Sequence, residues 1–129
     1  MMNSNKYLVE SARTVKHFDE GKHFSREEID LLHAGLGMAT EAGEFVDSLK
    51  KYIFYGKALD TVNLKEEIGD MLWYMALAIR ILGTSFEELM ETNIDKLYTR
   101  YPEKFTEYHA LNRNLEEELK ILKDGKTKT

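Results

Sequence analysis

The chain has 129 residues, a net charge of −5, no cysteine and one proline. This length suits a single domain, and the lack of cysteine excludes disulfides and thiolate metal sites. The negative charge argues against nucleic-acid binding, and no apolar stretch reaches the ~20 residues of a membrane span. We therefore expect one domain over residues 1–129, located in the cytoplasm, with neither nucleic acid nor membrane as a partner.

Helix-favouring composition and capping signals predict four or five helices and no strand of useful length. A first helix is expected over residues 5–16. Ser25 and Glu28 match a capping box that opens a long second helix to Tyr55, where Gly56 can end it. The first half of the chain is therefore expected to be dominated by one long helix.

Three further elements follow in the same way. Residues 63–66 match a second capping box, which opens a helix that stops at Gly83. Residues 85–88 match a third, and that helix must end before Pro102 because the residue before a proline is disfavoured as helical. A last helix over residues 112–123 precedes a frayed tail.

Two four-residue segments, one in each of the two long predicted helices, share one sequence pattern. Glu41 and Glu44 lie three positions apart on one helix, Glu67 and Asp70 on the next, and a glycine precedes the second acid of each pair. Acids at this spacing lie on one helix face, and a mid-helix glycine costs about 1 kcal/mol relative to alanine. At about 100° per residue, each pair lies along the edge of its helix's apolar arc. If the arcs pack together, four carboxylates border one seam, and such oxygen ligands suit Mg²⁺ or Mn²⁺.

A further motif lies downstream. Residues 93–102 read Asn-Ile-Asp-Lys-Leu-Tyr-Thr-Arg-Tyr-Pro, and Phe105 follows. Together with the two acid pairs in this order, the motif resembles the all-α MazG-like nucleoside triphosphate pyrophosphohydrolases, over residues 31–105. Many members carry another glutamate where this chain has Thr40, so the number of metal ions stays open.

The resemblance implies an activity and a set of residue roles. Such enzymes hydrolyse a nucleoside triphosphate between its α and β phosphates, releasing pyrophosphate and a monophosphate. The implied catalytic metal ligands for Mg²⁺, with Mn²⁺ as an alternative, are Glu41, Glu44, Glu67 and Asp70. One of these acids can also hold the attacking water as base, and we favour Glu44. The implied phosphate-binding residues are Asn93, Lys96, Arg100 and Tyr101.

The resemblance also implies the architecture. We expect an all-α bundle of four to five helices, completed by oligomerisation to a homodimer or homotetramer. The motif-bearing part covers about residues 25–105, and residues 112–129 form a C-terminal helix and tail. Trp73 lies away from the apolar arc of its own helix, which predicts a second buried face and hence a subunit contact.

Two other interpretations stay open. A di-iron carboxylate bundle would need Glu-x-x-His pairs on two helices, and that spacing occurs between Glu20 and His23 across a loop glycine. A non-catalytic helical interaction module, whose acids merely solvate it, would show no stabilisation by metal ions. Such a module would also tolerate Glu41→Gln.

Overall fold

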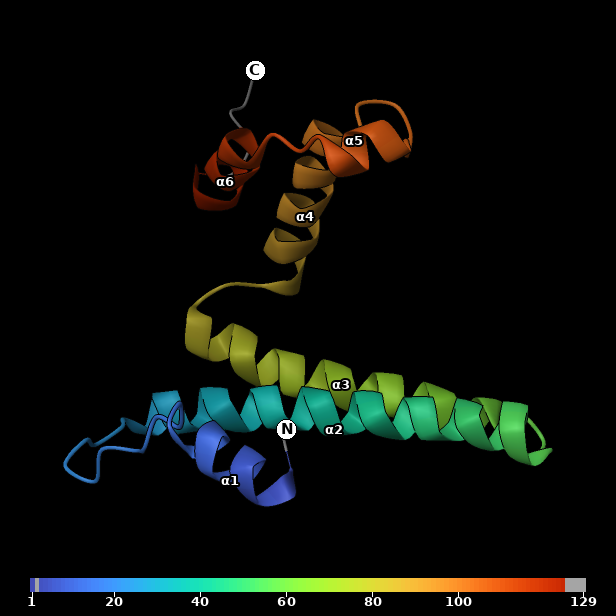
Figure 1. Cartoon of the computed structure of the whole chain (residues 1–129). Coiled ribbons are helices and arrows are strands. Elements are labelled where there is room, and N and C mark those ends of the chain that lie inside the picture. Colours follow the sequence, from blue (N-terminus) through green and yellow to red (C-terminus); the bar gives the residue numbers. More distant parts are fainter. Residues whose placement is uncertain (2, 125–129) are drawn as a thin grey trace.

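The computed structural model describes residues 1 and 3–124, and the described residues form helices without any strand (Figure 1). This confirms the all-α prediction. The predicted tail over residues 125–129 lies outside the described residues. The helices are α1 (Ser4–Ala12), α2 (Arg26–Tyr55), α3 (Thr61–Leu82), α4 (Phe86–Arg100), α5 (Glu107–Leu111) and α6 (Leu115–Asp124).

The two long helices, α2 and α3, form an antiparallel hairpin (Figure 1). Their ends follow the predicted signals. The Ser25 hydroxyl accepts the Glu28 backbone N–H at 3.1 Å, and the Glu28 carboxylate accepts the Ser25 N–H at 2.7 Å, which completes the capping box. Gly56 and Gly83 end α2 and α3 with φ of 64° and 67°, a left-handed conformation that glycine adopts without strain.

Some predicted boundaries are wrong. The Asp60 carboxylate accepts the Asn63 backbone N–H at 2.9 Å, so Asp60 rather than Asn63 caps α3. The first helix ends at Ala12, after which the backbone turns with i to i−3 bonds. The short helix α5 was not predicted. It begins because the Thr106 hydroxyl accepts the His109 N–H at 3.1 Å.

The helices pack in two separate groups. Within the described chain, the helix pairs in extensive contact are α2 with α3 and α4 with α6. The helix α4 leads away from the hairpin, and α5 and α6 lie near the end of α4 that is remote from the hairpin (Figure 1). No described helix combines the length and the apolar character that crossing a membrane requires.

Little apolar surface is buried within this arrangement. Among the described residues, Ala34 is the one apolar side chain that is fully buried. The chain exposes 11056 Å² of accessible surface. A compact monomer of this mass would expose about 7000 Å². The excess of about 4000 Å² is what an incomplete bundle would leave open.

Candidate metal centre

Three of the predicted acids converge between the two long helices. Glu41 of α2 and Glu67 and Asp70 of α3 each offer one carboxylate oxygen, and these oxygens lie within 4.8 Å of one another. We call these three residues the acidic triad. An octahedral Mg²⁺ holds its oxygens at about 2.1 Å and neighbouring oxygens about 3 Å apart, which small side-chain movements would reach.

The three acids differ in burial, and Glu67 lies deeper than the sequence predicted. Glu67 is only 4% exposed and Glu41 is half-buried, whereas Asp70 is exposed. Glu41 follows Ala34 and Met38 at the alternating spacing of four and three residues that faces a partner helix. Glu67 therefore lies inside the α2–α3 contact rather than at the edge of an apolar arc, whereas Glu41 and Asp70 line the open cleft described below.

Charge coupling links the acids. Burial raises the pKa of Glu41, and the charge of Glu44, a hydrogen bond with Glu67 and the charge of Asp70 raise it further. A carboxylate held among other carboxylates resists ionisation because the like charges repel. A bound divalent cation would remove this repulsion, so the electrostatics of the triad favour a metal ligand set.

Two side-chain hydrogen bonds in series hold the carboxylate of Glu67 in place. The Asn63 side-chain amide donates to Glu67 Oε1 at 2.6 Å, and the Ser48 hydroxyl of α2 donates to the Asn63 side-chain oxygen. Sequence reasoning missed this role because it assigned Asn63 to the helix cap. The available signal is the four-residue spacing between Asn63 and Glu67, which places both on one helix face.

The fourth acid, Glu44, lies apart from the three converging oxygens. Its side chain is exposed, and it reaches the triad through its charge on Glu41. Thr40, the residue before Glu41, donates its hydroxyl to the Gly37 carbonyl at 2.9 Å. Within the described residues, the triad is the one group of three or more metal-ligating side chains, and no histidine joins it, unlike a di-iron site.

An open cleft of about 410 Å³ adjoins the triad, lined by Glu41, Asp70, Trp73 and Tyr74. Trp73 is 57% exposed, and its ring meets that of Tyr74 edge to face at 5.0 Å between centroids. The lining is therefore part acidic and part aromatic, and we call Trp73 and Tyr74 the aromatic wall.

A glycine positions the aromatic wall. A Cβ added at Gly37 would lie 2.2 Å from a ring carbon of Tyr74, so only glycine permits this approach. The Tyr74 ring also meets that of His33 edge to face at 5.7 Å between centroids. Gly43 and Gly69, the glycines between the paired acids, differ from Gly37 because a Cβ added at either would meet nothing within 4 Å. The repeated glycine therefore has no steric cause among the described residues.

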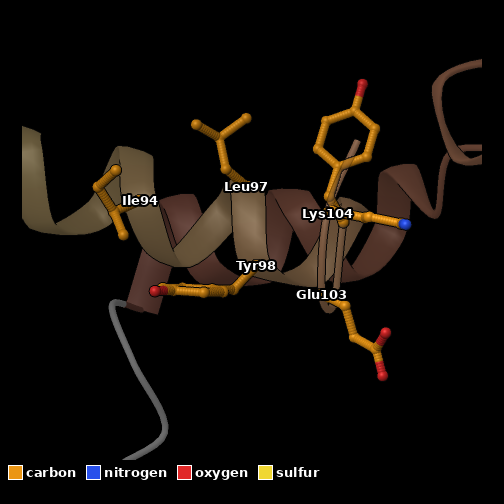
Figure 2. Close-up of a pocket in the computed structure, with 6 residues that line it drawn as sticks. Ile94, Leu97, Tyr98, Glu103 and Lys104 are labelled. Carbon is orange, nitrogen blue, oxygen red and sulfur yellow. The ribbon is translucent and has the colours of Figure 1, made fainter. Parts of the chain in front are cut away.

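The predicted phosphate-binding residues lie elsewhere, on α4 and just beyond it. The cleft beside the triad is lined by α2 and α3 alone, so the structure does not bring these residues to the acids. Arg100 is instead hydrogen-bonded to Glu118 of α6, and Tyr101 lines a second pocket of about 350 Å³. Figure 2 shows the side chains of Ile94, Leu97 and Tyr98 at this pocket. This pocket is lined by Ile94, Leu97, Tyr98, Tyr101, Glu103 and Lys104.

Comparison with known protein families matches residues 30–105 to the MazG nucleotide pyrophosphohydrolase domain. The match covers more than half of the chain and includes both acid pairs and the α4 motif. The chain therefore belongs to the MazG nucleotide pyrophosphohydrolase domain family, as its motifs indicated. Comparisons with curated proteins and with solved structures found no match.

Proposed function

We propose that this protein is a divalent-metal-dependent nucleotide pyrophosphohydrolase. It cleaves a nucleoside or deoxynucleoside triphosphate into the monophosphate and pyrophosphate, for sanitation or control of the cytoplasmic nucleotide pool. The observation that carries this proposal is the convergence of Glu41, Glu67 and Asp70 beside a cleft with an aromatic wall. The family membership of the chain supports the same reaction class.

The charges of protein and substrate explain the need for metal ions. A triphosphate brings about four negative charges to a site that is already acidic, and the two would repel without cations. When bound, Mg²⁺ would neutralise phosphate charge and lower the pKa of a bound water. Glu67 supplies a ligand oxygen that Asn63 already orients, and Glu41 and Asp70 complete the set. Glu44, exposed and outside the triad, accepts the proton of the attacking water.

The aromatic wall provides a place for the base. Trp73 is exposed and lines the same cleft as Glu41 and Asp70. Stacking of a base on an aromatic ring stabilises binding by about 1–3 kcal/mol and tolerates any base. A nucleotide whose base stacks on Trp73 would have its phosphates directed towards the carboxylates.

We further propose that the active form is a homodimer or homotetramer. The excess exposed surface of about 4000 Å² exceeds one chain's share of a permanent dimer interface, roughly 1000–2500 Å². On the side of α2 turned away from α3, Leu36, Ala39, Gly43 and Val46 recur at helical spacing, and Val46 is 61% exposed. A second helix packed there would explain the glycine that nothing in one chain explains. The same contact would let the α4 residues of one copy approach the acids of another.

The test is an assay of purified protein against a panel of ribo- and deoxyribonucleoside triphosphates, with and without Mg²⁺. We expect pyrophosphate rather than orthophosphate, and release only with the metal. Glu67→Gln should lower turnover by roughly 100-fold or more, because metal-ion catalysis contributes several kcal/mol. Glu66→Gln, an exposed neighbour on α3, is the matched control. Release of neither product across the panel would favour the non-catalytic interaction module instead.

A further inference from the structure

Two arginines meet on one buried glutamate where α4 and α6 pack together. Glu118 of α6 is 3% exposed. Its Oε1 accepts Nε of Arg100 at 3.0 Å and Nε of Arg113 at 3.2 Å, and its Oε2 accepts Nη2 of both at 2.6 Å. Both arginines therefore present the same edge to the same carboxylate.

This geometry leaves donors available. A guanidinium carries five N–H donors in a fixed plane, and Glu118 engages the Nε and one Nη2 donor of each arginine. The opposite edge of each guanidinium is not engaged by Glu118, and Arg100 also shares a side-chain hydrogen bond with Tyr101. The side chain of Arg113 is 41% exposed and that of Arg100 is 17% exposed, so solvent reaches both groups.

The positive charge beside Glu118 exceeds what is needed to neutralise this glutamate and hold α6 on α4. One arginine would neutralise Glu118, and the second leaves the group with a net charge of +1. The hydrogen bonds that Arg113 donates to Glu118 raise the pKa of Arg113, while the neighbouring charge of Arg100 acts in the opposite direction. Lys96, one turn before Arg100 on α4, adds a further cation on that face. Such a concentration of cations in a protein of net charge −5 suits a multiply charged anion.

We propose that Arg100 and Arg113 form a two-arginine clamp for a diphosphate group, and that Glu118 is the positioning residue that holds both guanidinium planes. The clamp rests on the proposed function in one respect, because it identifies the anion with the pyrophosphate part of a nucleotide. Arg113 and Glu118 lie beyond the family match at residues 30–105, so the clamp extends the α4 motif with residues of the C-terminal segment.

The first experiment measures binding of sodium pyrophosphate by calorimetry in the presence of EDTA. Without divalent ions the acidic triad repels the anion, so the titration reports the clamp alone. Wild-type protein should bind, and Arg113→Gln should weaken binding by roughly tenfold or more, as expected for loss of charge-assisted hydrogen bonds. Lys120→Gln removes one exposed positive charge from α6 outside the clamp and should change the affinity less than twofold. Equal affinities for wild type and Arg113→Gln would overturn the proposal.

A second variant tests the role of Glu118. Glu118→Gln should weaken pyrophosphate binding, because it frees the two guanidinium groups to repel each other. Tighter binding would show that Glu118 competes with the phosphate and would overturn its positioning role. Circular dichroism and thermal melting establish whether α6 remains folded. If Glu118→Gln unfolds α6, the Arg113→Gln variant decides whether the clamp binds pyrophosphate, because it keeps the Arg100–Glu118 ion pair.

Failure of the clamp and failure of the proposed function give different results. If pyrophosphate binding depends on Arg113 but no triphosphate is hydrolysed, the clamp proposal stands and the proposed enzymatic function is rejected. Metal-dependent hydrolysis, with pyrophosphate binding and KM both insensitive to Arg113→Gln, would leave the enzyme and reject the clamp. If both hold, Arg113→Gln should raise KM more than it lowers kcat.

Discussion

Asn63 holds Glu67 in place from one turn earlier on α3, through a side-chain hydrogen bond of 2.6 Å. Ser48 reaches across from α2 to the same amide, so the bond also ties the two helices together. A buried carboxylate is costly unless it is hydrogen-bonded, and Asn63 supplies such a bond to Oε1 of Glu67. The most buried acid of the triad is therefore oriented before any ligand arrives.

We predict that Asn63→Leu lowers Mg²⁺ affinity by roughly tenfold, as loss of an outer-shell partner commonly does. Calorimetric titration of Mg²⁺ without nucleotide measures the effect. Asn112→Leu makes the same replacement at the C-terminal end of α5, outside the proposed site, and should leave the Mg²⁺ affinity unchanged. Equal affinities for the two variants would mean that Asn63 does not support a metal ligand.

Gly37→Ala should lower the melting temperature. The new methyl group would overlap the Tyr74 ring at 2.2 Å, and overpacking of this kind costs about 1–3 kcal/mol. Gly35→Ala, where nothing lies within 4 Å, should instead gain up to about 1 kcal/mol from helix propensity. Thermal melts of the two variants measure the contrast, and similar melting temperatures would contradict the close contact between Gly37 and Tyr74.

Val46→Lys should dissociate the proposed oligomer. Val46 is 61% exposed in one chain, where a lysine would change stability by less than about 0.5 kcal/mol. At a contact between copies the same lysine would bury a charge, which is strongly unfavourable. Sedimentation velocity measures the result, with Glu27→Lys at the start of α2 as the control. A wild-type protein that sediments as a monomer would refute the proposed assembly.

Acid should loosen the packing of α6 on α4. Hydrogen bonds from Arg100 and then Arg113 lower the pKa of Glu118 from 4.5 to about 2, against the effect of burial. Because the folded-state pKa is depressed, the stabilisation is fully present above pH 4.5 and is lost as the pH falls towards about 2. Urea unfolding across this range should show a steeper loss of stability for wild type than for Glu118→Gln. Parallel pH profiles would contradict the ion-pair account.

The parts of this structure set by local chemistry were predictable. Gly56 and Gly83 end their helices where the chain must turn left-handed, and Ser25 caps α2 through its own hydroxyl. At α3 two suitable caps, Asp60 and Asn63, lie within one turn, and spacing alone does not choose between them. The structure uses the earlier one because Asn63 is drawn into the contact with α2.

Features that depend on packing were not predictable in the same way. The sequence analysis treated the apolar side of α2 as one arc, but of two adjacent apolar residues Phe45 is half-buried and Val46 is exposed, so the apolar residues of α2 do not all share one environment. Arg100 and Glu118 lie 18 positions apart in different helices, and no periodic pattern relates them. Such pairings follow from how α6 returns to α4, which only the folded chain reveals.

Trp73 is the one tryptophan of the chain, and it borders the cleft that contains two acids of the triad. Its fluorescence emission therefore reports from a single place in the molecule. Paramagnetic Mn²⁺ bound to the triad should quench that emission, and a stacked nucleobase should quench it too, each in proportion to occupancy. The native chain thus carries its own optical probe of ligand binding, without any attached dye.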